Sequence, residues 1–460
     1  MTLIKSISGI RGTIGGSPGD NLTPIDVVKY TAAFATTIFE VTPNKKLTFI
    51  VGRDARISGK MVEDLVCTTL IGMGINVINT GLSTTPTVEM AVVGHQADGG
   101  IIITASHNPK QWNALKLLNG KGEFISAIEG ERVLKLAKEE AFRFAEVDHL
   151  GEITTDNTTI EKHIEAILKL TLVDVNLIKE SNFKIAVDAV NSTGGIAIPR
   201  LLKALGVEEI IELYCEPTGE FPHNPEPLPE HLTMISKTVL ENMADMGIVV
   251  DPDVDRLAFV MENGHMFGEE YTLVAVADYV LQNQKGNTVS NLSSTKALRD
   301  VTEKMGGTYQ ASAVGEVNVV EKMKEVQAVI GGEGNGGVIY PELHYGRDAL
   351  VGVALILTYL AKTKQSLSQL RATYPDYFVS KNKVQLTPET DVEGLYNQVL
   401  DKYKHLPVLT IDGVKVEFPD GWVHVRTSNT ESIMRVYAEA PSPEKAQAYA
   451  DEVMKILKTV

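Results

Sequence analysis

Short apolar runs rich in β-branched residues recur along the chain, and polar or glycine-rich stretches follow them directly. Five runs predict buried strands, at residues 47–51, 99–103, 183–187, 247–250 and 328–330. The segments between them predict helices, and Thr23 followed by Pro24 is typical of an N-cap with proline in the first turn. A charged helix is expected over residues 127–145 and a buried one over the apolar run 349–357. This alternation predicts an α/β fold.

The C-terminal part of the chain has a different pattern. Residues 414–418 and 422–425 alternate apolar and polar positions on either side of Pro419-Asp420-Gly421, which predicts a β-hairpin. Another strand is expected at residues 434–437, and Ser442 followed by Pro443 is typical of the start of a helix. The first α/β block is expected to close near residue 150, with two further α/β units before this C-terminal region.

Composition narrows the classes of function. A length of 460 residues predicts roughly three domains, and 43% hydrophobic with 22% charged residues is ordinary for a soluble globular protein. The net charge of −16 argues against a nucleic-acid binder or an anionic-membrane partner, although a local arginine cluster can still bind a small anion. Cys67 and Cys215 lack metal-site spacing and are expected to be reduced thiols. With no signal peptide and no membrane-length apolar run, a cytoplasmic location is expected.

The first candidate site follows the strand at residues 99–103. Ser106 and His107 lie in the loop at residues 104–109, and Asn108 followed by Pro109 is a turn signal. Ligands bind at the carboxyl ends of strands in open α/β sheets. The loop therefore holds either a nucleophile with a neighbouring imidazole or an ordinary polar turn.

The second candidate site is a cluster of aspartates after the strand at residues 247–250. Asp251, Asp253 and Asp255 alternate with other residues, and Pro252 opposes regular strand pairing. Carboxylate oxygens suit Mg²⁺ or Ca²⁺. An EF-hand is excluded because Arg256 stands where the glycine of its sharp turn belongs. The alternative is a solvated acidic turn, in which the crowded carboxylates would raise one another's pKa.

Two further loops carry chemistry that suits a phosphosugar. Residues 331–337 contain five glycines, too many for a structural strand, and Glu333 and Asn335 suit sugar hydroxyls. A flexible hairpin turn is the alternative there, and the absence of a following Lys-Ser/Thr argues against a P-loop. The loop after the hairpin has the donors that phosphate oxygens require. These are Arg426, Ser428, Asn429 and Thr430.

In this combination and order, the loops resemble those of the α-D-phosphohexomutases over essentially the whole chain. Residues 104–109 resemble that family's phosphoserine loop and residues 251–256 its magnesium loop. Residues 332–337 resemble its sugar-recognition loop and residues 426–430 its phosphate-binding loop. Smaller matches lie at residues 9–12, 52–59, 113–116 and 188–195.

The resemblance implies a heart-shaped molecule with a central active-site cleft. Three similar α/β domains with mixed sheets would precede a smaller C-terminal α+β domain, and each domain would supply one loop. The expected limits are residues 1–150, 151–252, 253–366 and 367–460. The fourth domain is expected to be mobile, because a bound intermediate must turn over in the cleft.

The resemblance also implies a mechanism. Ser106 would carry a phosphoryl group and would hold Mg²⁺ together with Asp251, Asp253 and Asp255. A phosphoserine beside three aspartates brings the local charge to about −5, which one Mg²⁺ cannot balance. The remaining positive charge is expected from Arg11, Lys116 and Arg256.

Phosphate would move between C6 and C1 of a hexose through a hexose 1,6-bisphosphate. His107 and Lys116 are the candidates for proton transfer, and Lys116 would need a lowered pKa for that role. The sugar would contact Glu333 and Asn335. The idle phosphate would be held by Arg426, Ser428, Asn429 and Thr430.

The chain departs from the usual family pattern at Pro252, Val254, Asn335 and Gly337. A sugar-loop histidine of many members is absent at position 337, and His344 or Arg347 could replace it. The Asn335 version resembles archaeal-type phosphoglucosamine mutases, so glucosamine phosphate is the leading substrate. Phosphomannomutase/phosphoglucomutase activity is the alternative.

Two rival functions remain open at this point. A metal-dependent phosphatase would use Ser106 as its nucleophile and release phosphate to water. A non-enzymatic phosphosugar or calcium sensor would bind its ligand without needing Ser106. The partner expected in every case is a small molecule, and neither nucleic acid nor a membrane is expected. The sequence does not determine the oligomeric state.

Overall fold

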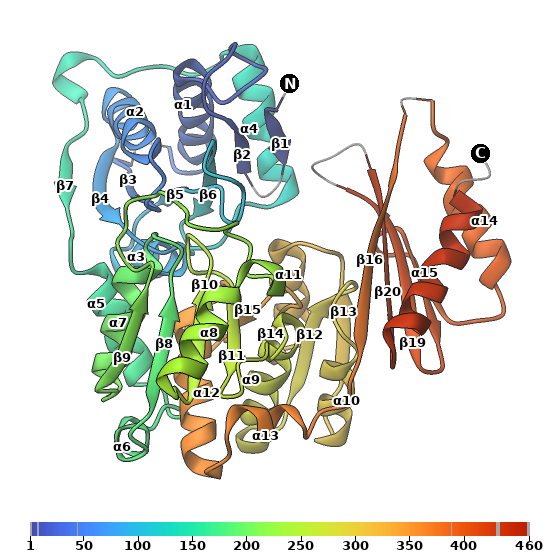
Figure 1. Cartoon of the computed structure of the whole chain (residues 1–460). Coiled ribbons are helices and arrows are strands. Elements are labelled where there is room, and N and C mark those ends of the chain that lie inside the picture. Colours follow the sequence, from blue (N-terminus) through green and yellow to red (C-terminus); the bar gives the residue numbers. More distant parts are fainter. Residues whose placement is uncertain (1, 7–8, 44, 388, 429–432, 458–460) are drawn as a thin grey trace.

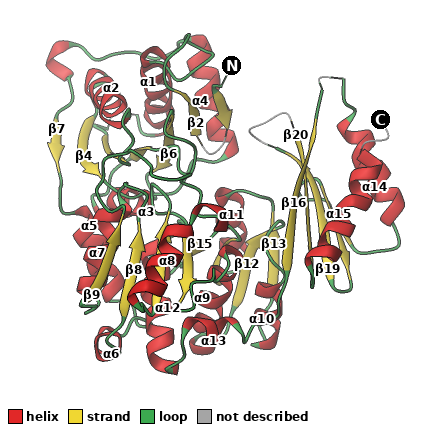
Figure 2. Cartoon of the chain, viewed as in Figure 1, coloured by secondary structure: helices red, strands yellow, loops and turns green. Residues whose placement is uncertain are grey.

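The computed structural model describes residues 2–6, 9–43, 45–387, 389–428 and 433–457. Among these residues the strands form four sheets, each belonging to one structural unit along the chain (Figure 1). The first sheet has seven strands, the second and third have four each, and the fourth has five. Helices cover the sheets, as the colouring by secondary structure shows (Figure 2).

The elements of the first two units have the following bounds. The first unit contains β1 Ile4–Ser6, β2 Gly9–Thr13, α1 Pro24–Val41, β3 Thr48–Arg53, α2 Gly59–Gly72, β4 Asn76–Leu82, α3 Thr85–Gly94, β5 Gly99–Ile103, β6 Trp112–Asn119, α4 Ala127–Glu139, a 3₁₀ turn Val147–His149 and β7 Ile153–Thr155. The second contains α5 Thr159–Leu168, α6 Val175–Glu180, β8 Lys184–Asp188, α7 Gly194–Ala204, β9 Glu209–Leu213, a 3₁₀ turn Pro229–His231, α8 Thr233–Asn242, β10 Met246–Val250 and β11 Leu257–Met261.

The elements of the last two units follow. The third unit contains α9 Glu269–Asn283, β12 Asn287–Asn291, α10 Ala297–Lys304, β13 Tyr309–Ser312, α11 Glu316–Glu325, β14 Ala328–Glu333, β15 Gly337–Ile339, α12 Ala349–Thr363 and α13 Leu367–Arg371. The fourth contains β16 Phe378–Gln385, α14 Val392–Tyr403, β17 Val408–Leu409, β18 Val414–Phe418, β19 Gly421–Thr427, β20 Ile433–Ala440 and α15 Pro443–Leu457.

The first three units repeat one topology. Each contains four adjacent strands in the spatial orders β6-β5-β3-β4, β11-β10-β8-β9 and β15-β14-β12-β13. Among these four strands, the three that come first along the chain pair in parallel, and the last one pairs antiparallel with the one before it. The prediction of three similar α/β units with mixed sheets is confirmed, and the antiparallel fourth sheet is the smaller C-terminal unit.

The repeated topology puts the candidate loops in equivalent places. Residues 104–109, the serine loop, connect β5 toward β6, and residues 251–256, the aspartate loop, connect β10 to β11. The turn between β14 and β15 lies within residues 332–337, the glycine loop. Each loop therefore leaves the carboxyl end of a buried strand and enters the antiparallel strand beside it.

Local sequence signals explain why these elements form. Thr23 caps α1 in a capping box with Asp26, an arrangement that contributes about 1 kcal/mol. Residues 349–361 of α12 are all buried, as the apolar run predicts, and Asp348 caps this helix by accepting from the backbone of Leu350 and Val351. One face of each repeated sheet is covered by a single helix, which is α3 in the first unit, α8 in the second and α11 in the third. Each of these helices packs into a small hydrophobic core of its own.

Two predicted elements differ from the structure. The helix expected to reach residue 145 ends at Glu139, because Glu140 adopts a left-handed conformation with φ of 50°. The strand expected at residues 328–330 continues through Gly331, Gly332 and Glu333, which pair with β15. Close packing explains those glycines, since a Cβ at Gly331 would lie 2.5 Å from Met323 Sδ. The prediction that the glycine run is too permissive for a strand is therefore wrong for its first three residues.

The sheets also extend past two expected limits. β7 lies beyond residue 150 but pairs with β4 of the first sheet. β11 lies beyond residue 252 but pairs with β10 of the second. The aspartate loop therefore lies within the second unit and not at its end.

The fourth unit packs beside the third (Figure 1). Arg299 of α10 forms an ion pair with Glu417 of β18, and buried Lys415 donates to the carbonyl of Leu292. Nδ1 of His424 and the hydroxyl of Ser293 form a hydrogen bond of 2.9 Å. Helices α14 and α15 lie on the outer side of its sheet (Figure 2). The contacts of this unit with the rest of the chain are thus concentrated on the third unit.

Candidate active site

Ser106 reaches the aspartate loop directly. Its Oγ donates to Asp251 Oδ2 at 2.7 Å and lies 3.3 Å from Nδ1 of His107. The residue has a φ of 47°, a left-handed conformation that serine rarely adopts. The serine loop of the first unit and the aspartate loop of the second therefore meet at this hydroxyl.

A buried arginine holds the serine loop in this strained shape. Arg56, with Asp54 as its carboxylate partner at 3.0 Å, donates to four backbone carbonyls. The four acceptors are the carbonyls of Ser106, Asn108, Pro109 and Trp112. Thr104 donates to Asp54 and accepts from the backbone N–H of Ser106. Arg56 is a positioning residue for Ser106.

We expect Arg56→Lys to lower the free energy of unfolding by about 2 kcal/mol, because one ammonium cannot replace a guanidinium that donates to four carbonyls and a carboxylate. For a domain of about 150 residues this corresponds to a fall in Tm of roughly 4–8 °C. Thermal unfolding measures it. The matched control is Arg132→Lys, at an exposed arginine of α4 paired with Glu40. A fall in Tm no larger than that of the control would contradict this role.

The three aspartates form a buried group with oxygens available to a cation. One carboxylate oxygen from each of Asp251, Asp253 and Asp255 lies within 4.8 Å of the others, and all three residues have no exposed surface. Oδ1 of Asp253 and Oδ1 of Asp255 accept no hydrogen bond from any residue the structure describes. Buried oxygens without donors are what a hard cation would satisfy, so this group fits Mg²⁺.

The aspartate loop has an unusual backbone. Val254, fully buried, has a φ of 64°, a left-handed conformation that a β-branched residue rarely adopts and that glycine adopts without strain. The loop is fixed from the second unit by Ser192 and Thr193, whose hydroxyls both donate to the carbonyl of Pro252. From the first unit, Thr85 donates to Asp253 through its hydroxyl at 2.6 Å.

The three carboxylates do not titrate alike. Burial, with Asp255 and Asp253 nearby, raises the pKa of Asp251 well above its usual value, as the crowding of carboxylates predicts. Burial also acts to raise the pKa of Asp255, but the cations of Arg347 and Lys116 outweigh it and hold that pKa below its usual value. Crowding alone therefore does not decide the charge of the group.

Lys116 does not have the lowered pKa that a neutral base requires. Its Nζ lies 2.7 Å from Asp253 and 3.3 Å from Asp255. Burial acts to lower the pKa of Lys116, but these two carboxylates raise it by a larger amount, so the net shift is upward. The lowered pKa that proton transfer by Lys116 would need is therefore absent, because the two aspartates outweigh burial. By contrast, burial and the nearby Arg256 and Arg11 lower the pKa of His107 well below its usual value, which leaves a neutral imidazole beside Ser106.

Arg347 joins the aspartate loop to the glycine loop. Its guanidinium contacts Asp255 at 2.7 Å, Glu333 at 2.8 Å and Glu316 at 3.1 Å. The arginine also fills the space beside Gly337, where an added Cβ would lie 2.4 Å from Arg347 Cδ. A side chain at position 337 and Arg347 in this place exclude one another, so Arg347 occupies the room that a histidine would need.

The remaining predicted residues have these places. Arg11 lies near the serine loop, 3.5 Å from Asn108 Oδ1, and Arg256 lies 3.4 Å from Glu226. Asn335 accepts from the backbone of Gly337 within the turn, so the glycine loop is a hairpin turn beside the site.

The predicted phosphate loop lies in the fourth unit. Arg426, at the end of β19, donates to the carbonyl of Thr427, and the backbone of Ser428 donates to Ile433. Asn429 and Thr430 lie outside the described residues. The serine and aspartate loops thus meet at Ser106 and Asp251, and Arg347 links the aspartate and glycine loops, while Arg426 lies on β19 of the fourth unit.

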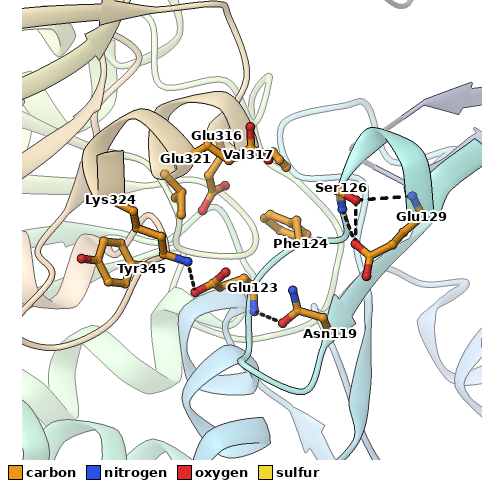
Figure 3. A pocket seen from close by; sticks show the side chains of 11 residues that line it. Asn119, Glu123, Phe124, Ser126, Glu129, Glu316, Val317, Glu321, Lys324 and Tyr345 are labelled. Carbon is orange, nitrogen blue, oxygen red and sulfur yellow. Dashed lines mark hydrogen bonds and ion pairs between the residues drawn. The ribbon is translucent and has the colours of Figure 1, made fainter. Parts of the chain in front are cut away.

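A pocket lies between the first and third units beside this site (Figure 3). It is lined by Asn119, Glu123, Phe124, Ser126, Glu129, Glu316, Val317, Val320, Glu321, Lys324 and Tyr345. Lys324 of α11 bridges it with an ion pair to Glu123 at 2.5 Å. Glu316 belongs both to this pocket and to the contacts of Arg347.

Sequence reasoning missed the central positions of Arg56 and Glu316, and it named Arg347 only as a possible replacement for the sugar-loop histidine. A signal existed for Arg56, because it lies in a basic loop bounded by Gly52 and Gly59. No local signal marks Glu316, since its role depends on the arrangement of β14, β15 and α11.

A buried serine hydroxyl against a group of carboxylates that fits Mg²⁺ suits phosphoryl transfer, in which a metal ion neutralises the charge on the transferring group. The four successive matches to phosphoglucomutase/phosphomannomutase agree with this class: alpha/beta/alpha domain I over residues 3–144, domain II over 161–264, domain III over 268–377 and the C-terminal domain over 382–456. The chain belongs to this family of phosphohexomutases, and it is an intramolecular phosphotransferase.

Individual relatives cover the whole chain. The phosphoglucomutase/phosphomannomutase of Thermococcus kodakarensis is 36% identical, covering 97% of this chain and 98% of its own. The phosphoglucosamine/phosphogalactosamine mutase of Sulfurisphaera tokodaii is 31% identical, covering 100% of both. The crystal structure of a phosphoglucomutase/phosphomannomutase family protein from Burkholderia thailandensis has a TM-score of 0.85 at 26% identity, covering 99% of this chain and 97% of that one.

Within the residues that the structure describes, every helix falls short of the length and apolar character that crossing a bilayer requires.

Proposed function

We propose that this enzyme interconverts the 6- and 1-phosphates of glucosamine through a phosphorylated Ser106. The contact that carries the proposal is the 2.7 Å hydrogen bond from Ser106 Oγ to Asp251. It puts a buried hydroxyl nucleophile directly against the carboxylates that fit a divalent cation.

In this proposal Ser106 stores the phosphoryl group between turnovers. Its transfer to the free hydroxyl of a hexose phosphate gives a hexose 1,6-bisphosphate, and return of the other phosphate regenerates phosphoserine. Mg²⁺ held by Asp251, Asp253, Asp255 and a phosphoserine oxygen would supply positive charge for the transferring group.

The proton movements are assigned from the electrostatics. His107, neutral and 3.3 Å from Ser106 Oγ, is placed to take or return the proton of the reacting hydroxyl. Lys116 is better suited to donate a proton or to neutralise charge than to act as a base, because its pKa is raised. Arg11 and Arg256 would add positive charge at the phosphoryl group.

The fourth unit would hold the phosphate that is not reacting. Arg426 and Ser428, with Asn429 and Thr430, form the proposed phosphate loop. The same loop would serve both orientations of the substrate, so the proposal requires movement of the fourth unit during turnover.

The glycine loop is the reason for proposing glucosamine over other hexoses as the substrate. Glu333 and Asn335 are the proposed sugar contacts, and Arg347 occupies the space beside Gly337. The resemblance of the Asn335 version of this loop to archaeal-type phosphoglucosamine mutases supports glucosamine, and so does the name of the relative from Sulfurisphaera tokodaii. Phosphoglucomutase/phosphomannomutase activity is the second candidate, because the relative from Thermococcus kodakarensis carries that name.

A substrate panel tests the assignment. We expect glucosamine 6-phosphate to have a kcat/KM more than tenfold above those of glucose, mannose and N-acetylglucosamine 6-phosphates, and activity to require Mg²⁺ and a trace of sugar bisphosphate. Tenfold is about 1.4 kcal/mol of difference in transition-state binding. A smaller preference would favour the second candidate. Steady release of inorganic phosphate at the rate of turnover would instead indicate a phosphatase.

A further inference from the structure

A second group of metal-ligating side chains lies where the first three units meet. His163 comes from α5 of the second unit, while His344 and Asp348 precede α12 of the third. His163 Nε2 lies 2.9 Å from Asp348 Oδ2, and His344 Nε2 lies 3.3 Å from the same oxygen. One ligand atom from each residue lies within 4.8 Å of the others. The proposed catalytic roles use none of these side chains.

The outer atoms of His163 and Asp348 are already held by hydrogen bonds. Thr87 of α3 lies 2.9 Å from Nδ1 of His163, which leaves Nε2 facing the group. Oδ1 of Asp348 accepts from the first turn of α12, which leaves Oδ2 facing the group. Partners of this kind fix the orientation of the side chains that bind metals in proteins.

Glu89 supplies an independent observation. This residue of α3 is only 2% exposed, yet neither carboxylate oxygen accepts a hydrogen bond from any described residue. Its Oε2 lies 3.4 Å from Nδ1 of His344. The backbone is adapted to this carboxylate, since a Cβ at Gly346 would lie 1.9 Å from Oε2. Glu89 is therefore a buried acceptor directed at the outer nitrogen of His344.

We propose that His163, His344 and Asp348 bind a first-row divalent cation of the zinc type. The ligand atoms are Nε2 of both histidines and Oδ2 of Asp348. A histidine that binds metal through Nε2 carries its proton on Nδ1, and this proton is the donor that Glu89 lacks. Tetrahedral zinc with bonds near 2.0–2.1 Å places its ligand atoms about 3.3 Å apart, close to the separation of His344 and Asp348.

The donor set separates this site from the aspartate loop. Two imidazoles and one carboxylate suit zinc and its neighbours, whereas Mg²⁺ prefers oxygen ligands alone. The side chains of His163 and Asp348 are fully buried, so the group is shielded from solvent, and three protein ligands leave one position of tetrahedral zinc for a water molecule. Such a cation would join the second and third units directly and would fix the segment that carries Arg347, which adjoins Asp348 in the chain. The first unit takes part through Thr87 and Glu89 of α3, which lie beside the two histidines.

Zinc binding to the full-length protein tests the proposal. Protein stripped with a chelator is titrated with Zn²⁺ in excess Mg²⁺, which occupies the aspartate loop. We expect one equivalent to bind, a rise in Tm on addition, and visible absorption bands of tetrahedral Co²⁺ when cobalt replaces zinc. Absence of zinc binding at micromolar concentrations in the wild-type protein would overturn the proposal, and so would cobalt without these bands.

Variants assign the ligands. His344→Gln and His163→Gln should each weaken zinc binding at least 100-fold. His265→Gln, at an exposed histidine, should not change it, and neither should Asp253→Asn in the aspartate loop. Retention of zinc by both histidine variants, or its loss in Asp253→Asn, would overturn the assignment. If a histidine variant does not fold, the cobalt spectrum of the wild-type protein decides alone.

Discussion

Ser106→Ala is expected to reduce mutase turnover by about 10³-fold or more, since no other group can store the phosphoryl group between turnovers. That loss corresponds to at least about 4 kcal/mol of transition-state stabilisation. The coupled assay with glucosamine 6-phosphate measures it. Peptide mapping of the freshly purified wild-type protein should place a phosphate on Ser106 in part of the molecules, and the variant should lack it.

The matched control is Ser17→Ala, at an exposed serine, which should keep full activity and the phosphate on Ser106. Ser106→Ala should also keep the fold, because only the contacts of its hydroxyl with Asp251 and His107 are lost. Full activity of a folded Ser106→Ala protein would refute the phosphoserine mechanism. If the wild-type protein shows no turnover and Ser106→Ala still binds the phosphosugar, the result would instead support a non-enzymatic phosphosugar sensor.

Arg347→Met is expected to lower the free energy of unfolding by about 3–5 kcal/mol, because it leaves buried Asp255, Glu333 and Glu316 without their shared cation. The melting temperature and the kcat/KM for glucosamine 6-phosphate are the two measurements. Activity should fall with stability, since the same guanidinium sets the position of the aspartate and glycine loops.

Arg347→Lys separates charge from geometry at this position. One ammonium retains the positive charge but cannot contact three carboxylates in the plane of a guanidinium, so the fold should survive while kcat/KM falls by about tenfold or more. Arg200→Met, at an exposed arginine paired with Glu161, is the surface control. A stable and fully active Arg347→Met protein would show that the ion pairs are dispensable.

The pattern of the sequence was sufficient for the buried strands and the α/β class, whereas the three similar units with mixed sheets followed from the resemblance to the phosphohexomutases. Buried strands such as β5 and β10 are β-branched runs that end in polar loops, so their limits are local properties. The end of α4 was not predictable, because Glu140 stops it in a left-handed conformation that glutamate rarely adopts. The length of β14 was also not predictable, because its glycines are required by close packing against β15 and α11 and not by their neighbours in the chain.

The site was predictable to the extent that it depends on local motifs. Ser106 and the three aspartates follow strands directly, and the expected contact between their loops is present. The state of Lys116 was not predictable, because its pKa depends on carboxylates from another unit. The same holds for Arg347, whose three partners lie on β14, on α11 and in the aspartate loop.

The shared position of the serine, aspartate and glycine loops has a consequence for assembly. Ser106 belongs to the first unit, and Asp251, Asp253 and Asp255 belong to the second, so neither unit alone holds the serine and the aspartates together. The hydroxyl of Ser106 and the carboxylate of Asp251 come into contact only where these two units dock. The interfaces between units, more than the sheets themselves, determine when this protein becomes an enzyme.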